Sequence, residues 1–206
     1  MRLIGNVRCR QADSTDNNLE YGTGEVGDSC DKAPKLKDLP KYMDKAAECV
    51  QIWMEEGHTK YQGAAAAGVA YQESGFNIKA KESKVGTGAS GVYQYIPKYD
   101  HERIVDAGYD GNKKYIDYGF EDQIKIEIRR WKKESETGRD KLYKWFKQSN
   151  NVLDALYAFL IHIAHPKSYK GSDKPTKEQA MDAANHAGGN GNVYICYATS
   201  IYKNLK

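Results

Sequence analysis

The sequence has few branched apolar residues, no long apolar run and little net charge. Leu, Ile, Val and Phe make up about 17% of the 206 residues, below the ~20% at which disorder becomes a concern. Disorder also requires a high net charge, however, and the formal charge here is only +3. Because the chain contains 16 Tyr, 3 Trp and alanine-rich stretches, we expect a folded core built mainly from Tyr and Ala.

The same absences exclude several classes of protein. No run reaches the ~18 to 20 apolar residues of a membrane helix, and the N-terminus lacks the apolar stretch of a signal peptide. A charge of +3 is too small to indicate nucleic-acid binding, although it allows attraction to an anionic polymer such as a bacterial wall. We therefore expect a soluble protein without an export signal.

Four cysteines are present, and none forms a C-x-x-C pair, which excludes a zinc ribbon and a thioredoxin motif. They are Cys9, Cys30, Cys49 and Cys196. The residues leave two alternatives open: free buried thiols, or a disulfide between Cys9 and Cys30 that staples the N-terminal segment. A bridge from Cys9 or Cys30 to one of the later cysteines would instead tie this segment into the domain.

The composition of the chain changes near residue 38. Residues 1–37 are rich in Gly, Asn and Asp and predict an N-terminal arm or attachment segment. Residues 38–206 show apolar residues at helical spacing and predict one domain, with capping boxes at Thr59 and Thr176 that mark helix starts. Residues 76–97 contain glycines between short β-prone pieces. The predicted fold class is α+β, mainly α-helical, with a small β-hairpin or sheet insertion after the second helix.

One acidic side chain, Glu73, lies at the C-terminal end of an expected helix that has no other charge after Lys60. The negative end of the helix dipole and apolar neighbours such as Val69 and Phe76 favour the protonated carboxyl. A general acid must hold a proton near neutral pH, so this position suits one. A solvated glutamate at a helix end is the structural alternative.

Two motifs around Glu73 carry a family resemblance. Residues 71–77 read Y-Q-E-S-G-F-N, and residues 88–94 read G-A-S-G-V-Y-Q. Together they resemble the E-S-G-F-N and G-x-x-G-[LV]-x-Q motifs of lysozyme-like cell-wall hydrolases, particularly the phage tail lysozymes and the goose-type and lytic transglycosylase groups. Residues 120–131 and 155–166 resemble later helices of the tail-lysozyme family, so the resemblance covers about residues 39–187.

The resemblance implies a lysozyme-like fold that cleaves the MurNAc-β-1,4-GlcNAc bond of peptidoglycan, as a virion-associated tail lysin. It assigns the catalytic acid to Glu73 and a place in the glycan groove to Gln94. It also makes Glu82, nine residues after Glu73, the expected second carboxylate, with Asp100 and Asp117 as alternatives. A lytic transglycosylase needs no second carboxylate, because the substrate forms an anhydro-sugar internally.

Other residues are candidates for binding the glycan. Tyr93, Tyr95 and Tyr157 could stack on sugar rings, with Tyr93 the first candidate. Thr87 could position a water, and Gly91 belongs to the second motif. With 16 Tyr in the chain, each ring could equally belong to the core. The expected partner is bacterial peptidoglycan, and residues 1–37 are candidates for binding other phage tail proteins. We expect no cofactor, no nucleic acid and no membrane.

Other residues of the chain allow competing interpretations. A zinc site on His162, His165 and His186 is disfavoured because the sequence contains no H-E-x-x-H motif. A thiol hydrolase is disfavoured because Cys49 falls on the apolar side of its helix. Two alternatives stay open: a non-catalytic lysozyme-fold protein of the virion or wall, and a lytic transglycosylase of a conjugation or wall-remodelling system. The expected location is the virion tail, or outside the cell at the host wall.

Overall fold

Helices make up most of the chain that the structure describes. The computed structural model describes residues 30, 33–81, 88–164, 173–186 and 190–205. Within these ranges eight α-helices follow one another: α2 (Met43–Glu55), α3 (Lys60–Ser74), α4 (Asp100–Asp106), α5 (Phe120–Glu136), α6 (Leu142–Gln148), α7 (Val152–Ala164), α8 (Lys177–His186) and α9 (Gly191–Asn204). The shorter 3-10 helices are η1 (Leu36–Tyr42), η2 (Pro97–Tyr99) and η3 (Tyr115–Asp117). None of the helices in these ranges is long and apolar enough to cross a membrane.

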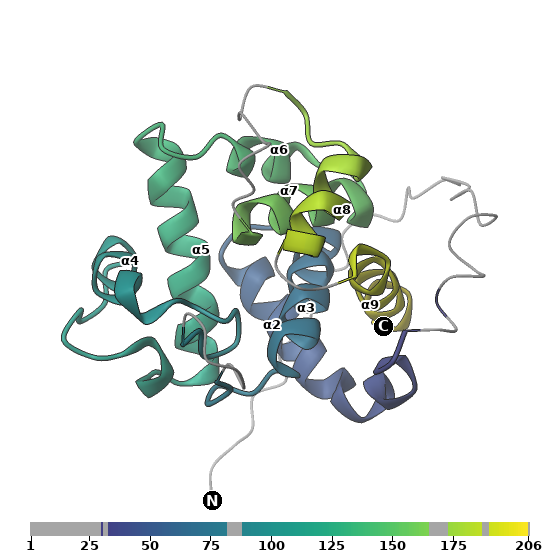
Figure 1. The fold of residues 1–206 in the computed structure, drawn as a ribbon, viewed down its shortest axis with the longest axis horizontal. Helices are drawn as coiled ribbons and strands as arrows, with labels where there is room; N and C mark the ends of the chain where they lie inside the picture. Colours follow the sequence, from purple (N-terminus) through teal and green to yellow (C-terminus); the bar gives the residue numbers. More distant parts are fainter. Residues whose placement is uncertain (1–29, 31–32, 82–87, 165–172, 187–189, 206) are drawn as a thin grey trace, which may run out of the picture.

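Helix α3 is the central element of the fold, with α5 on one side and α9 on the other (Figure 1). Residues 62–71 are all buried, because α2, α7 and α9 pack against this helix. Its small side chains allow close approach: a Cβ at Gly68 would lie 2.7 Å from the backbone nitrogen of Ala198 in α9. The expected core of Tyr and Ala is confirmed, and α9 lies directly against the helix that carries Glu73.

Both predicted capping boxes are confirmed. At the start of α3 the Thr59 side chain accepts the backbone N–H of Gln62, and the Gln62 side chain accepts the backbone N–H of Thr59. Thr176 and Gln179 make the same reciprocal pair of hydrogen bonds at the start of α8. Local chemistry therefore sets where these two helices begin.

The chain turns sharply after α3. Gly75 has a left-handed backbone (φ 60°), and its N–H donates to the carbonyl of Tyr71. Phe76 is also left-handed (φ 62°), which is uncommon for a residue with a side chain. Its ring packs 5.7 Å from the ring of Tyr71 and 6.1 Å from that of Phe120, and this packing holds the turn. Glu73 consequently lies in the last turn of a helix that cannot continue.

The predicted β-hairpin insertion over residues 76–97 is not seen as strands in the described part of the chain. Its sheet-like contacts are isolated bridges from Ser90 to Lys81 and to Tyr95. Residues 82–87, which hold the rest of this prediction, lie outside the described residues.

The backbone of the second motif explains this correction. Gly91 (φ 78°) and Gln94 (φ 52°) are both left-handed, whereas strand residues have strongly negative φ. The chain therefore reverses between Ser90 and Tyr95, whose backbone groups exchange two hydrogen bonds of 2.8 Å. Over the described residues the fold is mainly α-helical rather than α+β.

A disulfide joins Cys30 to Cys196, 166 positions apart in the chain. The alternative of a Cys9–Cys30 bridge is therefore wrong, and Cys9 itself lies outside the described residues. Cys49 is free and buried, as expected, and its sulfur lies 3.8 Å from the hydroxyl of Tyr93. Burial raises the pKa of the Cys49 thiol to about 12, so it stays protonated and unreactive near neutral pH.

Contacts cross the predicted domain boundary between residues 37 and 38. Cys30 is bonded to α9, Ala33 is buried, and the backbone of Lys35 is hydrogen-bonded to tyrosines of α3 and α9. The boundary stays a prediction, and a truncated chain described in the Discussion tests it.

Candidate active site

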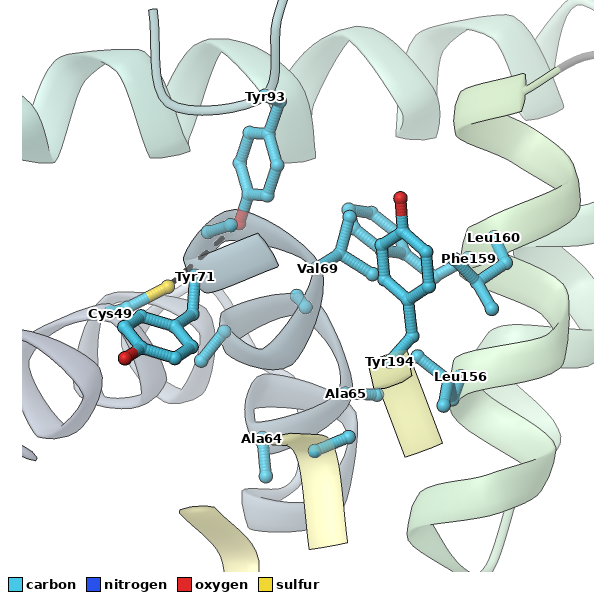
Figure 2. Close-up of a cluster of buried hydrophobic side chains, with 14 of the residues drawn as sticks. Cys49, Ala64, Ala65, Val69, Tyr71, Tyr93, Leu156, Phe159, Leu160 and Tyr194 are labelled. Atoms are coloured by element: carbon cyan, nitrogen blue, oxygen red, sulfur yellow. Dashed lines mark hydrogen bonds between the residues drawn. The ribbon is translucent and has the colours of Figure 1, made fainter. Parts of the chain in front are cut away.

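The Glu73 carboxyl lies between α3 and α9. Its Oε1 accepts a hydrogen bond of 2.5 Å from the hydroxyl of Tyr194. Figure 2 shows the ring of Tyr194, from α9, among buried apolar side chains of α3 and α7, including Val69 and Leu156. The close approach of α9 to α3 at Gly68 brings this hydroxyl to the carboxyl.

Three influences set the proton affinity of Glu73. Burial raises its pKa, while the hydrogen bond from Tyr194 and the positive charge of Lys35 act in the opposite direction. Burial dominates, so the pKa of Glu73 lies above its ordinary value. Burial and the neighbouring carboxylate raise the pKa of Tyr194, which keeps the hydroxyl as a donor. The site therefore holds a carboxylic acid that keeps its proton to a higher pH than an exposed glutamate does.

Gly91 and Gln94 of the second motif form a tight turn. A Cβ at Gly91 would lie 2.5 Å from the ring of Tyr115 and 2.7 Å from Oε1 of Gln123, so only glycine fits. The Gln94 side chain donates to the carbonyl of Gly91 over 2.9 Å and remains half-buried. Gly91 thus has a conformational role, and Gln94 presents its amide at the surface of the turn.

Gln123 ties this turn to the segment that follows α3. It is fully buried, its Oε1 accepts the N–H of Val92, and its amide donates to the carbonyls of Ile78 and Tyr118. The resemblance of residues 120–131 to a family helix includes Gln123 but assigns it no role. The available signal was a polar residue on the buried face of an amphipathic helix.

A cavity of about 440 Å³ lies beside Gln94. It is lined by Tyr93, Gln94, Tyr95, Ile96, Tyr99, Glu102, Arg103, Asp106, Arg130, Glu134, His162, Ile163 and Ala164. Tyr99 is 45% exposed at its rim, and the cavity combines aromatic rings with charged groups of both signs. Such a lining suits a polar ligand with apolar faces, as sugars are.

A buried charge network joins α5 to α7 at this cavity. Arg130 donates to Glu127 over 2.9 Å, to Glu134 over 2.8 Å and to the hydroxyl of Tyr95 over 3.0 Å. His162 lies 2.8 Å from Glu127 through its Nε2. Burial alone would raise the pKa of Glu127, but the charge of Arg130 and the bond from His162 bring it well below its usual range.

The same network bears on the zinc alternative. Glu134, Asp140 and His162 place one ligand-type atom each within 4.8 Å of one another. The guanidinium of Arg130 lies among them, 2.8 Å from Glu134 and 2.7 Å from the His162 ring, and a cation there would be repelled. Two other histidines of that hypothesis are not tested, because His165 and the side chain of His186 lie outside the described residues.

The structure separates the predicted tyrosines. Tyr93 is 1% exposed, and its hydroxyl accepts the indole N–H of Trp53 over 3.1 Å, so its ring belongs to the core (Figure 2). Tyr157 on α7 is only partly buried, and burial raises the pKa of its hydroxyl. Tyr157 is thus more exposed than the Tyr93 ring, and the glycan-binding role of both stays a prediction.

The two described candidates for a second carboxylate have different surroundings. Glu82, like Thr87, is outside the described residues. Asp100 is buried in the wall of another cavity, of about 420 Å³, where it accepts the N–H of Tyr115 and burial raises its pKa. Asp117 is half exposed and lies 3.8 Å from Lys79.

Fold and site together define a class: a mainly α-helical protein whose central helix ends in a half-buried carboxyl with a raised pKa, and whose second motif forms a glycine-glutamine turn. The chain belongs to the phage tail lysozyme family, whose model, described as "Phage tail lysozyme", matches residues 44–188. The lysozymes of this family are peptidoglycan hydrolases of bacteriophage tails, so membership indicates that this protein acts on peptidoglycan. Comparison with curated proteins gave no match, and comparison with solved structures gave none.

Proposed function

We propose that this protein is a muramidase-type lysin of a phage tail that cleaves the β-1,4 bond between MurNAc and GlcNAc, with Glu73 as general acid. The observation that carries the proposal is the Glu73 carboxyl, whose pKa is raised by burial and which lies inside the family match. No other residue of α3 is acidic, so the helix end offers one proton donor.

The proposed step begins with proton transfer. The Glu73 carboxyl gives its proton to the glycosidic oxygen as the bond from the anomeric carbon breaks and its electron pair stays on that oxygen. Water or the sugar's own hydroxyl then adds to the sugar cation and gives its proton to a carboxylate, which restores the neutral product. Addition of water leaves a reducing end, and addition of the internal hydroxyl leaves an anhydro end. In the hydrolytic version we propose Glu82 as the second carboxylate, with Asp100 and Asp117 as alternatives.

The proposed glycan groove runs past Gln94 into the adjoining cavity. Gln94, in the cavity wall, has an amide that can bond to a sugar substituent, as Tyr93 of the same wall is proposed to do. Tyr157, which is half-buried and outside this lining, is proposed to offer an apolar face elsewhere on the glycan. Thr87 is proposed to position a water. The enzyme is proposed to act from the virion tail on the host wall, with residues 1–37 attaching it to other tail proteins.

The experiment that tests the proposed acid is Glu73→Gln, assayed on purified peptidoglycan. We expect normal folding and a loss of about two to four orders of magnitude in rate, because the amide cannot donate the proton. Glu136→Gln is the matched control, since Glu136 is an exposed glutamate at the C-terminal end of α5. A folded Glu73→Gln protein with wild-type activity contradicts the proposal.

Mass spectrometry of the digested wall distinguishes the two versions of the reaction. Reducing and anhydro ends differ by one water, so the products identify a hydrolase or a lytic transglycosylase. If the enzyme is a hydrolase, Glu82→Gln should reduce activity about as much as Glu73→Gln. Wild-type protein that binds peptidoglycan and releases no fragments supports instead the non-catalytic alternative.

A further inference from the structure

Two segments outside the family match meet at the end of α3. The match begins at residue 44 and ends at residue 188, so residues 33–42 precede it and α9 follows it. The disulfide between Cys30 and Cys196 joins them covalently. Residues 30 and 33–42 together with α9 are termed the clamp below.

The clamp fixes the position of Lys35. Its backbone N–H donates to the hydroxyl of Tyr197 in α9 over 3.0 Å, and its carbonyl accepts the hydroxyl of Tyr71 in α3 over 2.8 Å. Its ammonium donates to the carbonyl of Gln72 over 3.1 Å. Gln72 directly precedes Glu73, so a positive charge is held at the carbonyl end of α3 beside the proposed acid.

The clamp also supplies the hydrogen bond to Glu73. Tyr194 is 2% exposed and lies two residues before Cys196, so the disulfide and the contact of α9 with Gly68 both restrict it. Its hydroxyl reaches Oε1 of Glu73 from the side of α9, whereas the Lys35 ammonium approaches the end of α3 from the other segment.

We propose that Lys35 is a positioning residue for the Glu73 carboxyl: the clamp brings the Lys35 ammonium and the Tyr194 hydroxyl to the end of α3, where together they stabilise the carboxylate left after proton transfer. This inference rests on the proposed role of Glu73 as the acid. It assigns a function in catalysis to segments that the family match does not include.

The two groups should respond differently to salt. Along α3 itself no charged residue stands between Lys60 and Glu73, and the groups that act on Glu73 from the packed segments are Tyr194 and Lys35. Lys35 is exposed, so dissolved ions screen its charge. Tyr194 is buried, and its hydrogen bond is insensitive to ionic strength.

The first experiment compares Lys35→Gln with Lys37→Gln in the full, disulfide-bonded chain. Lys37 is an exposed lysine of the same segment, so the control removes the same charge. The readout is kcat/KM on peptidoglycan against pH, at low and high salt. For Lys35→Gln we expect a plateau about two- to fivefold lower, and an alkaline limb that moves to higher pH because the Glu73 carboxylate loses stabilisation. Both effects should shrink at high salt.

The second experiment removes the hydroxyl of Tyr194 and keeps its ring. Tyr194→Phe should move the alkaline limb in the same direction and lower the plateau by about tenfold or more, at both salt concentrations. Tyr202→Phe is the control, because it removes a hydroxyl from the same helix. A purely structural role of the clamp would lower stability and leave the alkaline limb where it is.

A titration of the Glu73 carboxyl separates this inference from the proposed function. The ¹³C resonance of Glu73, assigned by its absence in Glu73→Gln, is followed against pH in wild type, Lys35→Gln and Lys37→Gln. A midpoint that rises in Lys35→Gln alone supports the inference, and identical midpoints in all three proteins overturn it. Wild-type activity in Glu73→Gln instead overturns the proposed function, whatever the titration shows.

Discussion

Glu73 is half-buried and Glu127 is fully buried, and the protein shifts the pKa values of these two carboxyls in opposite directions. Glu73 has one hydroxyl donor and the exposed Lys35 near it, so desolvation dominates and its pKa is raised. Glu127 is fully buried and is still ionised, because the guanidinium of Arg130 bonds to both of its oxygens. The comparison teaches that partners, rather than depth, decide the direction in which the pKa of a carboxyl shifts.

The two environments also suit different purposes. The Glu127 carboxylate is hydrogen-bonded to Arg130, to His162 and to the hydroxyl of Tyr95. These bonds connect α5, α7 and the turn of the second motif. A general acid cannot be held in this way, because it must give up its proton to the substrate. Glu73 has few hydrogen-bonding partners, which is consistent with a role as a proton donor. Glu127 has several charged partners, which is consistent with a structural role.

The largest expected effect on stability is that of Glu127→Gln, which removes the charge of the more deeply buried carboxylate. The substitution leaves the buried guanidinium of Arg130 with Glu134 as its acidic partner, so we expect a loss of about 3 kcal/mol or more in the free energy of unfolding. Urea denaturation measures it. Glu136→Gln, at an exposed position, should change stability by less than about 0.5 kcal/mol. Equal stability of the two variants would show that the network is not what holds α5 to α7.

The second largest effect is expected at the clamp. Replacing Cys30 and Cys196 by Ser removes a crosslink across 166 positions, and we expect a loss of about 2 to 4 kcal/mol in the free energy of unfolding. Cys49→Ser is not a matched control because Cys49 is buried, so reduced wild type serves instead. If the oxidised and reduced proteins unfold at the same urea concentration, the disulfide has no stabilising role.

A chain that starts at Asp38 tests the predicted domain boundary. It keeps α2 to α9, so we expect it to fold, with about the same loss of stability as the cysteine variant, and to degrade purified peptidoglycan. It also lacks Lys35, so its pH profile should match that of Lys35→Gln. A truncated chain that does not fold would place residues 30 and 33–37 in the core of the domain.

Much of the helical framework could be predicted from the sequence, because its signals are local. Thr59 and Thr176 cap the starts of their helices through side-chain hydrogen bonds made within three residues. The end of α3 at Gly75 requires only a glycine in the left-handed conformation. The Glu73 position could be predicted for the same reason: it follows from the end of one helix and from a contiguous motif.

The remainder could not be predicted because it depends on residues far apart in the chain. Tyr194 is 121 positions from Glu73, and its hydrogen bond depends on how α9 docks on α3. The pairing of Cys30 with Cys196, rather than with the nearer Cys9, likewise depends on how α9 docks on α3. The predicted hairpin is wrong at Gln94. The backbone of this residue is left-handed, a conformation that few residues with side chains adopt.

The smallest expected effect, and the sharpest test of the comparison, is the pH dependence of stability in Glu73→Gln. The folded pKa of Glu73 lies above the ordinary value of 4.5, so folding favours the protonated acid; its contribution is present below pH 4.5 and is lost as pH rises through the folded pKa. Glu73→Gln should therefore match wild type at acidic pH and become more stable than wild type, by less than about 2 kcal/mol, at pH 7 and above.

The contribution of Glu127 to stability changes with pH in the opposite direction. Its folded pKa is depressed, so its contribution is present above pH 4.5 and is lost as pH falls, and the deficit of Glu127→Gln should narrow on acidification. Thermal unfolding of the three proteins from pH 3 to pH 8 checks both signs, and parallel curves for wild type and Glu73→Gln would mean that Glu73 ionises in the fold as it does in the unfolded chain.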